Sequence, residues 1–143
     1  MSVDDVSIRE HVDLGDGPEE GVATQAMVIL VTNVFGSWKM PLYYFLISDS
    51  FSWARKADIV SKVLERLIET NVIPTNLVCD NTSVNLTMLK ILGAEFETNI
   101  LNPVLNIKNI DGSHIYCYMD HPHLLKLVRN TLRKLTFLAN LDV

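Results

Sequence analysis

The chain has 143 residues and a mass of 16.1 kDa, the size of one domain with a substantial buried core. Hydrophobic residues make up 48% of it and the formal net charge is −5, so the composition is globular and argues against a stand-alone nucleic-acid binder, which needs a surplus of lysine and arginine. Two cysteines exclude a disulfide framework, and no secretory signal or membrane-length apolar run is visible, so we expect a soluble intracellular protein.

The first third of the chain predicts strands. Residues 1–22 are acidic and rich in turn residues, and we expect them to be a lead-in with room for one hidden strand. Residues 26–34 and 38–48 are apolar runs of β-favouring residues, joined by the turn Phe35-Gly36-Ser37. Two such runs with a short turn between them predict an antiparallel hairpin.

From residue 52 onward the period becomes helical and then alternates. Residues 52–70 predict an amphipathic helix, with Lys56 placed on its polar side. The remaining expectations are a short buried strand at 77–80, a helix between Thr82 and Leu92 that ends at Gly93, a loop-like stretch at 94–112, a strand at 114–119 and a last helix at about 123–138. A hairpin followed by alternating strands and helices predicts an α/β fold with a mixed sheet flanked by helices. Ribonuclease-H-like and flavodoxin-like arrangements both satisfy that order, and the hairpin favours the first.

Asp80 is the most informative single residue, because it stands where a buried strand ends and a helix begins. Ligands of open α/β sheets collect at the carboxyl ends of strands, and a carboxylate there can hold a hard cation such as Mg²⁺. Alternatively, Asp80 only caps the helix that follows it. A metal site needs further carboxylates, and Asp4, Asp5 and Asp13 are the upstream candidates, although an acidic terminus can equally be a solvated one.

Six short motifs follow one another in order along nearly the whole chain. They are Asp4-Asp5-Val6-Ser7-Ile8-Arg9, Val12-Asp13-Leu14-Gly15, Trp38-Lys39-Met40-Pro41-Leu42, Cys79-Asp80 with Asn85, Leu92-Gly93, and Asp120 with the run from His123 to Asn130. In this order they resemble the motifs of transposases of the P-element type, the group that includes the THAP-domain transposases. No one of these matches is specific. Their shared order and spacing are specific, and they identify the chain as similar to this family.

The resemblance implies a ribonuclease-H-like catalytic core in which three carboxylates hold Mg²⁺ for DNA cleavage and strand transfer. By motif, Asp4 takes the place of the first carboxylate, with Asp13 as the fallback, and Asp80 takes the place of the second. The opening strand is then expected to be clipped. The third carboxylate of the family, a glutamate, follows a GTP-binding insertion domain, and no residue up to Val143 matches it. We therefore expect one incomplete domain over residues 1–143, with residues 120–143 leading toward a missing insertion domain, no GTP binding, and no efficient catalysis by this chain alone.

The last helix carries Lys126, Arg129 and Arg133 on one side, opposite an apolar stripe. This pattern is a weak prediction of DNA contact, and the alternative is a solvated helix face. The resemblance implies DNA as the ancestral partner and a nuclear location. A second hypothesis is a non-catalytic interaction module that pairs with a copy of itself or with a longer transposase. Cys79 lies in a predicted buried strand and is expected to be inert.

Overall fold

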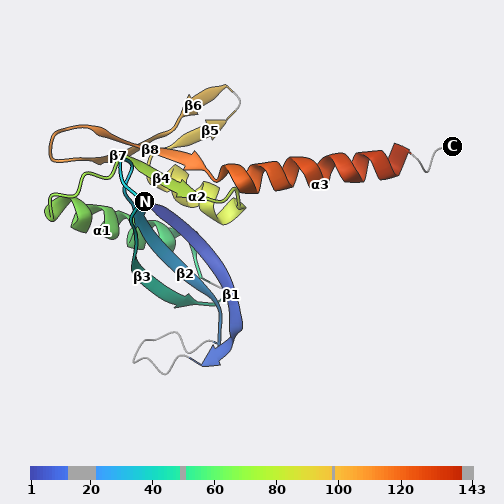
Figure 1. The fold of residues 1–143 in the computed structure, drawn as a ribbon, viewed down its shortest axis with the longest axis horizontal. Helices are drawn as coiled ribbons and strands as arrows, with labels where there is room; N and C mark the ends of the chain where they lie inside the picture. The colour runs from blue at the N-terminus through green and yellow to red at the C-terminus, as the bar shows by residue number, and fades with distance from the viewer. Residues whose placement is uncertain (13–21, 49–50, 98, 140–143) are drawn as a thin grey trace.

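The structure is a computed structural model that describes residues 1–12, 22–48, 51–97 and 99–139. Asp13 and the turn signal at residues 16–18 lie outside the described residues. The elements are β1 (Ser2–Val12), β2 (Val22–Thr32), β3 (Lys39–Ile47), α1 (Trp53–Glu69), β4 (Asn76–Cys79), α2 (Ser83–Ile91), β5 (Glu95–Glu97), β6 (Ile100–Asn102), β7 (Val104–Lys108), β8 (His114–Met119) and α3 (His121–Ala139). Figure 1 shows their arrangement.

Six of the strands form one mixed sheet in the order β3-β2-β1-β4-β8-β7. Strands β1 to β3 are antiparallel neighbours, β4 runs parallel to both β1 and β8, and β7 is antiparallel to β8. The short strands β5 and β6 pair separately. An antiparallel meander joined to parallel strands, with helices packed on the sheet, confirms the predicted α/β mixed-sheet fold.

Two stretches differ from the sequence-based expectation. Residues 2–12 are a strand of eleven residues rather than a turn-rich lead-in, which confirms the hidden strand. Its acidic residues disfavour a strand locally, but pairing with β2 on one side and β4 on the other satisfies the backbone and outweighs that preference. Residues 94–112 are not a loop but contain β5, β6 and β7, three strands of three to five residues that are too short to give a period.

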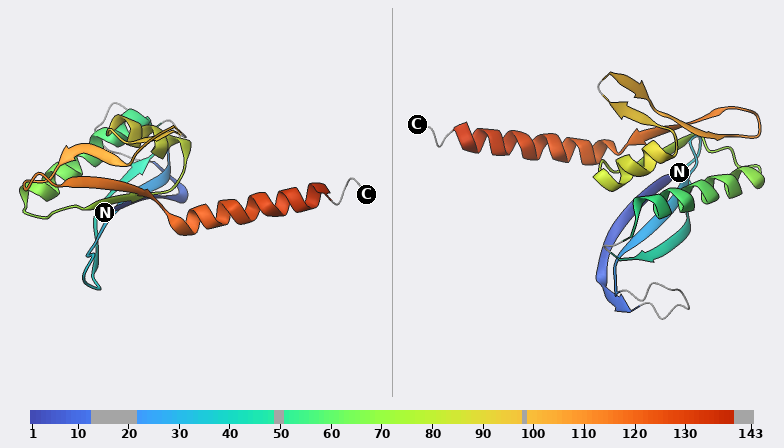
Figure 2. Two further views of the ribbon diagram at one scale, coloured as in Figure 1. Left: turned by 90° about the horizontal axis from the view of Figure 1, so that it is seen from above. Right: turned by 180° about the vertical axis from the view of Figure 1, so that it is seen from behind.

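The core lies between one face of the sheet and the helices α1 and α2. Figure 2, in the view from above, shows both helices on the same side of the sheet. Helix α1 begins after Ser52, whose hydroxyl accepts a hydrogen bond from the backbone N–H of Arg55 at 3.2 Å, as an N-cap does. The fully buried members of the core include Met27, Ile29, Val60, Leu64, Leu77, Met88, Leu89, Leu105 and Ile115.

Helix α2 ends as the sequence predicts. Leu92 is its C-cap, and Gly93 follows with φ +104°, a conformation that side-chain-bearing residues rarely adopt. A Cβ atom at Gly93 would also lie 2.3 Å from the side chain of Asn106. Glycine is therefore required here by backbone conformation and by space.

The opposite face of the sheet is open. Tyr44 on β3 and Tyr116 and Tyr118 on β8 are exposed there, alternating along their strands with residues that face the core. Helix α3 does not cover this face, because it projects away from the sheet in every view (Figures 1 and 2). None of the described helices is long and apolar enough to cross a membrane. The described part of the chain is thus a sheet with helices packed on one side.

Candidate functional site

The carboxyl end of β4 lies at the centre of the sheet, between β1 and β8. Both neighbours run parallel to β4, and its last residue, Cys79, pairs with Met119 at the end of β8 and with Val3 near the start of β1. Asp80 follows β4 directly, and the backbone N–H of Asp120, which follows β8, donates to the carbonyl of Cys79 at 2.9 Å. The sequence prediction that Asp80 stands at a strand end, before a helix, is confirmed.

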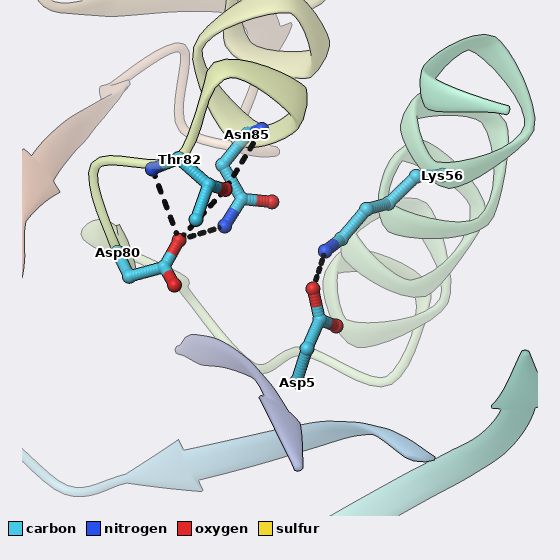
Figure 3. A network of polar contacts seen from close by, with 5 residues as sticks. All are labelled: Asp5, Lys56, Asp80, Thr82 and Asn85. Atoms are coloured by element: carbon cyan, nitrogen blue, oxygen red, sulfur yellow. Dashed lines mark hydrogen bonds and ion pairs between the residues drawn. The ribbon is translucent and has the colours of Figure 1, made fainter. Parts of the chain in front are cut away.

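One oxygen of the Asp80 carboxylate is held by three donors from the start of α2 (Figure 3). The Oδ1 atom accepts hydrogen bonds from the backbone N–H of Thr82 at 3.3 Å, from the hydroxyl of Thr82 at 2.9 Å, and from the side-chain amide of Asn85. Within the described part of the chain, the Oδ2 atom makes no hydrogen bond. The carboxylate is therefore oriented through one oxygen, and the other is left for a ligand.

The helix cap belongs to Thr82 and not to Asp80. Thr82 has the extended backbone of an N-cap, and its Oγ1 atom accepts from the backbone N–H of Asn85 at 3.4 Å. Asp80 lies two residues earlier and accepts hydrogen bonds from the cap residue. The side chain of Asp80 thus forms an Asx turn that connects the strand to the helix. This turn uses only one of the two carboxylate oxygens.

Asp4 occupies the matching position on the neighbouring strand. Val3 is the register partner of Cys79, and both are buried against the helices. Asp4 and Asp80 each come one residue later, at the end of the paired segment. Asp4 is exposed, because alternate residues of a strand face opposite sides of the sheet. The pairing of β1 with β4 therefore brings the backbones of the two predicted site residues near each other, while the Asp80 carboxylate is turned toward α2 and the Asp4 side chain toward the open face.

Asp5 points to the other side of the sheet, under α1. Its Oδ2 atom lies 2.5 Å from the ammonium of Lys56, and the side chains of Lys56 and Asp5 are 1% and 21% exposed. The expectation that Lys56 lies on the polar side of α1 is wrong. Lys56 precedes Val60 and Leu64 at four-residue spacing, which places it on the buried stripe. That spacing was the available signal, but only a partner 51 residues away makes a buried lysine tolerable.

The thiol of Cys79 lies among these charges. Burial, followed by the negative charge of Asp80, raises the pKa of Cys79 to about 12, while Lys56 partly opposes the rise. Burial also raises the pKa of Cys117, on the neighbouring strand, to about 11. Both cysteines are free and buried, so their thiols stay protonated at neutral pH.

The donor set at this edge suits a hard cation, because carboxylate oxygens are the ligands that Mg²⁺ prefers. Asp80 Oδ2 and the exposed Asp4 supply two such groups. Among the described residues, no group of three or more histidine, cysteine, aspartate or glutamate side chains is placed to hold a metal. The residues present thus fit part of the coordination shell of Mg²⁺. Water molecules can supply the remaining ligands, as they usually do for this ion.

The basic residues of the last helix lie elsewhere. Lys126, Arg129 and Arg133 are exposed on α3, which begins beside Asp120 and runs away from the sheet (Figure 1). Leu125, Val128 and Leu132 form the apolar stripe of the same helix and are exposed as well. Neither side of α3 packs on the described part of the sheet, so both are surfaces for a partner or for solvent.

The chain matches the family described as "TNP-like, RNase H N-terminal domain" over residues 4–93, more than half of its length. The chain belongs to this family. The match begins at Asp4, extends through Asp80 and the whole of α2, and ends at Gly93. It confirms the resemblance to P-element-type transposases.

Two known proteins are similar over most of the chain. The human DNA transposase THAP9 is 22% identical over 131 residues, which are 89% of this chain and 14% of that protein. The structure of the Drosophila P element transposase strand transfer complex matches with a TM-score of 0.68 and 20% identity, over 90% of this chain and 28% of that one. The structural match confirms the ribonuclease-H-like fold, and the chain spans only a small part of both relatives.

Proposed function

We propose that this chain is part of a DNA transposase core, and that Asp4 and Asp80 together hold a divalent cation, Mg²⁺, at the carboxyl end of β4. One observation carries the proposal. Three donors fix Oδ1 of Asp80, Oδ2 is left without a hydrogen bond in the described chain, and Asp4 follows Val3, the register partner of Cys79 on the neighbouring strand. Two carboxylates brought together repel each other, and a divalent cation offsets that repulsion.

The described residues supply orientation. Thr82 and Asn85 keep the carboxylate of Asp80 in one position, so its free oxygen does not need to be ordered when a cation binds. A bound Mg²⁺ supplies Lewis acidity toward a phosphate oxygen and toward the attacking hydroxyl or water. Asp4, exposed at the end of the paired segment, is the group that stays open to solvent and to DNA.

The described residues supply two proposed ligands, whereas phosphoryl transfer of this class uses several carboxylates and two cations. We therefore propose that this chain does not cleave DNA efficiently by itself. A nicking assay with supercoiled DNA in Mg²⁺ or Mn²⁺ tests this part of the proposal. We expect no nicking above background, and robust nicking that is lost in Asp80→Ala would contradict it.

DNA is the proposed partner, since the relatives are named as transposases. The exposed cations Lys126, Arg129 and Arg133 of α3 are the proposed phosphate contacts, and the nucleus is the proposed location. Replacing all three by glutamine should weaken DNA binding and flatten its dependence on salt, measured by fluorescence anisotropy between 50 and 200 mM salt. An unchanged salt dependence would show that these residues of α3 do not contact DNA.

Thermal melting tests the cation site itself. A ligand that binds only the folded state raises the melting temperature, so Mn²⁺ should stabilise the natural chain and should stabilise Asp4→Asn and Asp80→Asn much less. Asp58→Asn is the matched control, because Asp58 is an exposed acid of α1 that is paired with Lys62. Equal stabilisation of all four proteins would contradict the proposal.

A second candidate function is an interaction module, and the exposed stripe of α3 favours it. Leu125, Val128 and Leu132 recur at a spacing of three and four residues, the pattern of a helix that packs on another helix. Light scattering on the purified chain tests this function. A dimer that dissociates in Leu125→Glu/Leu132→Glu supports it, and a monomer at all concentrations opposes self-association.

A further inference from the structure

Lys56 and Asp5 form a charge pair inside the layer between sheet and helices. The Lys56 side chain is 1% exposed, and its ammonium lies 2.5 Å from Oδ2 of Asp5. A lysine is almost never so deeply buried unless it is paired. The pair lies on the helix-covered side of β1, opposite Asp4, and is separate from the cation site proposed above.

Two buried side-chain oxygens on this side of the sheet have no hydrogen-bond partner within the described part of the chain. They are Oδ1 of Asp5 and Oδ1 of Asn85, in a side chain that is 1% exposed. Figure 3 shows the amide nitrogen of Asn85 turned toward Asp80 and its oxygen turned toward the side on which Lys56 and Asp5 lie. Both Asp5 and Lys56 also act electrostatically on Cys79, between the strand edge and the helices. Carboxylate and amide oxygens without partners are the groups that a hard cation would take.

The positive charge at this place is already present in the chain. We propose that Lys56 is a built-in counter-cation for Asp5, and that it keeps a second divalent cation off the oxygens of Asp5 and Asn85. The inference rests on the proposed function only in that the first cation is assigned to Asp4 and Asp80. It makes this strand edge a site for one divalent cation, with the second positive charge supplied by a lysine.

Electrostatics at close range supports this role. A divalent cation bound to Asp5 would lie next to the ammonium, and two like charges at contact distance repel strongly in a poorly solvated site. The ammonium cannot move into water easily, because the stem of Lys56 is packed in α1 among Ala57, Val60 and the rest of the core. A purely structural ion pair predicts a different outcome, since removing the ammonium alone would then destabilise the fold and leave the number of bound cations unchanged.

The test counts Mn²⁺ bound by the full chain at pH 7, by equilibrium dialysis with electron spin resonance. Lys56→Met removes the charge and keeps an unbranched side chain that is shorter by one atom. We expect Lys56→Met to bind one Mn²⁺ per chain more than the natural protein. Asp5→Asn/Lys56→Met, which has neither charge, should return to the natural count, and so should Lys56→Arg, which keeps the cation.

Each outcome decides the proposal. The same count in Lys56→Met and in the natural chain overturns it, and so does an extra cation that persists in Asp5→Asn/Lys56→Met. If Lys56→Met does not fold in metal-free buffer, Mn²⁺ should restore its folding, and a variant that stays unfolded in saturating Mn²⁺ also overturns the proposal. Failure of the proposed function looks different: the natural chain would then bind no Mn²⁺ at Asp4 and Asp80, while the difference of one between Lys56→Met and the natural chain would remain.

Discussion

Two neighbouring acids of β1 lie on opposite faces of the sheet and have different environments. On the helix-covered face, Asp5 meets a lysine that is fixed in α1, and the charge is neutralised within the chain. On the open face, Asp4 is exposed and comes one residue after the register pair of Val3 and Cys79, with no cation of the chain paired to it among the described residues. The alternation of a strand thus separates a structural charge from one that is available to a ligand.

The same contrast holds for apolar residues. The covered face is filled by fully buried side chains from five strands and two helices. The open face presents tyrosines, and α3 presents leucines, to solvent. Exposed apolar surface of this kind marks a place for a partner, whereas the covered face is the part that stabilises the fold.

The largest expected effect breaks the charge pair of the covered face. Lys56→Met leaves the Asp5 carboxylate close to the core without its partner, which costs about 3–5 kcal/mol for a buried pair. Urea denaturation in metal-free buffer measures the loss. Asp5→Asn/Lys56→Met should recover most of it, and a double variant as unstable as Lys56→Met would show that the lysine stabilises the fold by packing alone.

Adjacent residues of β8 give the next comparison, since they face opposite sides. Ile115 is fully buried and Tyr116 is 40% exposed. Ile115→Ala should cost about 2–5 kcal/mol because it leaves a cavity in the core. Tyr116→Ala should cost much less, within about 1 kcal/mol, because its side chain is not enclosed. Similar losses measured by denaturation would mean that the open face is covered in solution.

The buried thiols predict a loss of stability at high pH. Their pKa values in the folded chain are raised, to about 12 for Cys79 and about 11 for Cys117, against a usual value of 9.0. Between pH 9 and these values the unfolded chain loses thiol protons that the folded chain retains. The contribution of the two thiols to the free energy of unfolding is therefore fully present below pH 9. Above pH 9 it is lost, by at most about 1.4 kcal/mol per pH unit for each thiol. Cys79→Ala should flatten the decline measured by denaturation, and an unchanged slope would contradict the assignment.

The smallest expected effect is at the start of α2. Thr82→Ala removes the N-cap hydroxyl and one donor to Asp80, and should cost about 1 kcal/mol of stability. Because this donor orients the carboxylate, Mn²⁺ binding should weaken about tenfold or more. Thr82→Ser keeps the hydroxyl and is the matched control. If calorimetry shows the same cation affinity in Thr82→Ala and Thr82→Ser, the hydroxyl of Thr82 does not contribute to cation binding.

Much of the fold was predictable because its signals are local. The helix predicted at residues 52–70 is α1 at Trp53–Glu69, and the strand predicted at 114–119 is β8. The hydrophobic pattern of each element is long enough for its period to be recognised in the sequence. Strand β1 was hidden because its acids disfavour strands, and β5 to β7 are too short to show a period.

The site was predictable only where it rests on position along one element. Asp80 was found because a strand end followed by a helix is visible in the sequence. The roles of Asn85 and Lys56 depend on contacts made by folding, across five residues in one case and 51 in the other. Which of the two acids, Asp4 or Asp5, meets the helices depends on the register of β1, which the sequence did not determine.

We propose that Asp80 offers one fixed carboxylate oxygen to a divalent cation that Asp4 also binds. Isothermal titration of Mn²⁺ into the full chain at pH 7 tests it most directly, with Asp80→Asn and the control Asp58→Asn. We predict that the natural chain and Asp58→Asn bind Mn²⁺ with the same affinity, and that Asp80→Asn binds it at least tenfold more weakly. Equal affinity in all three proteins would contradict the claim.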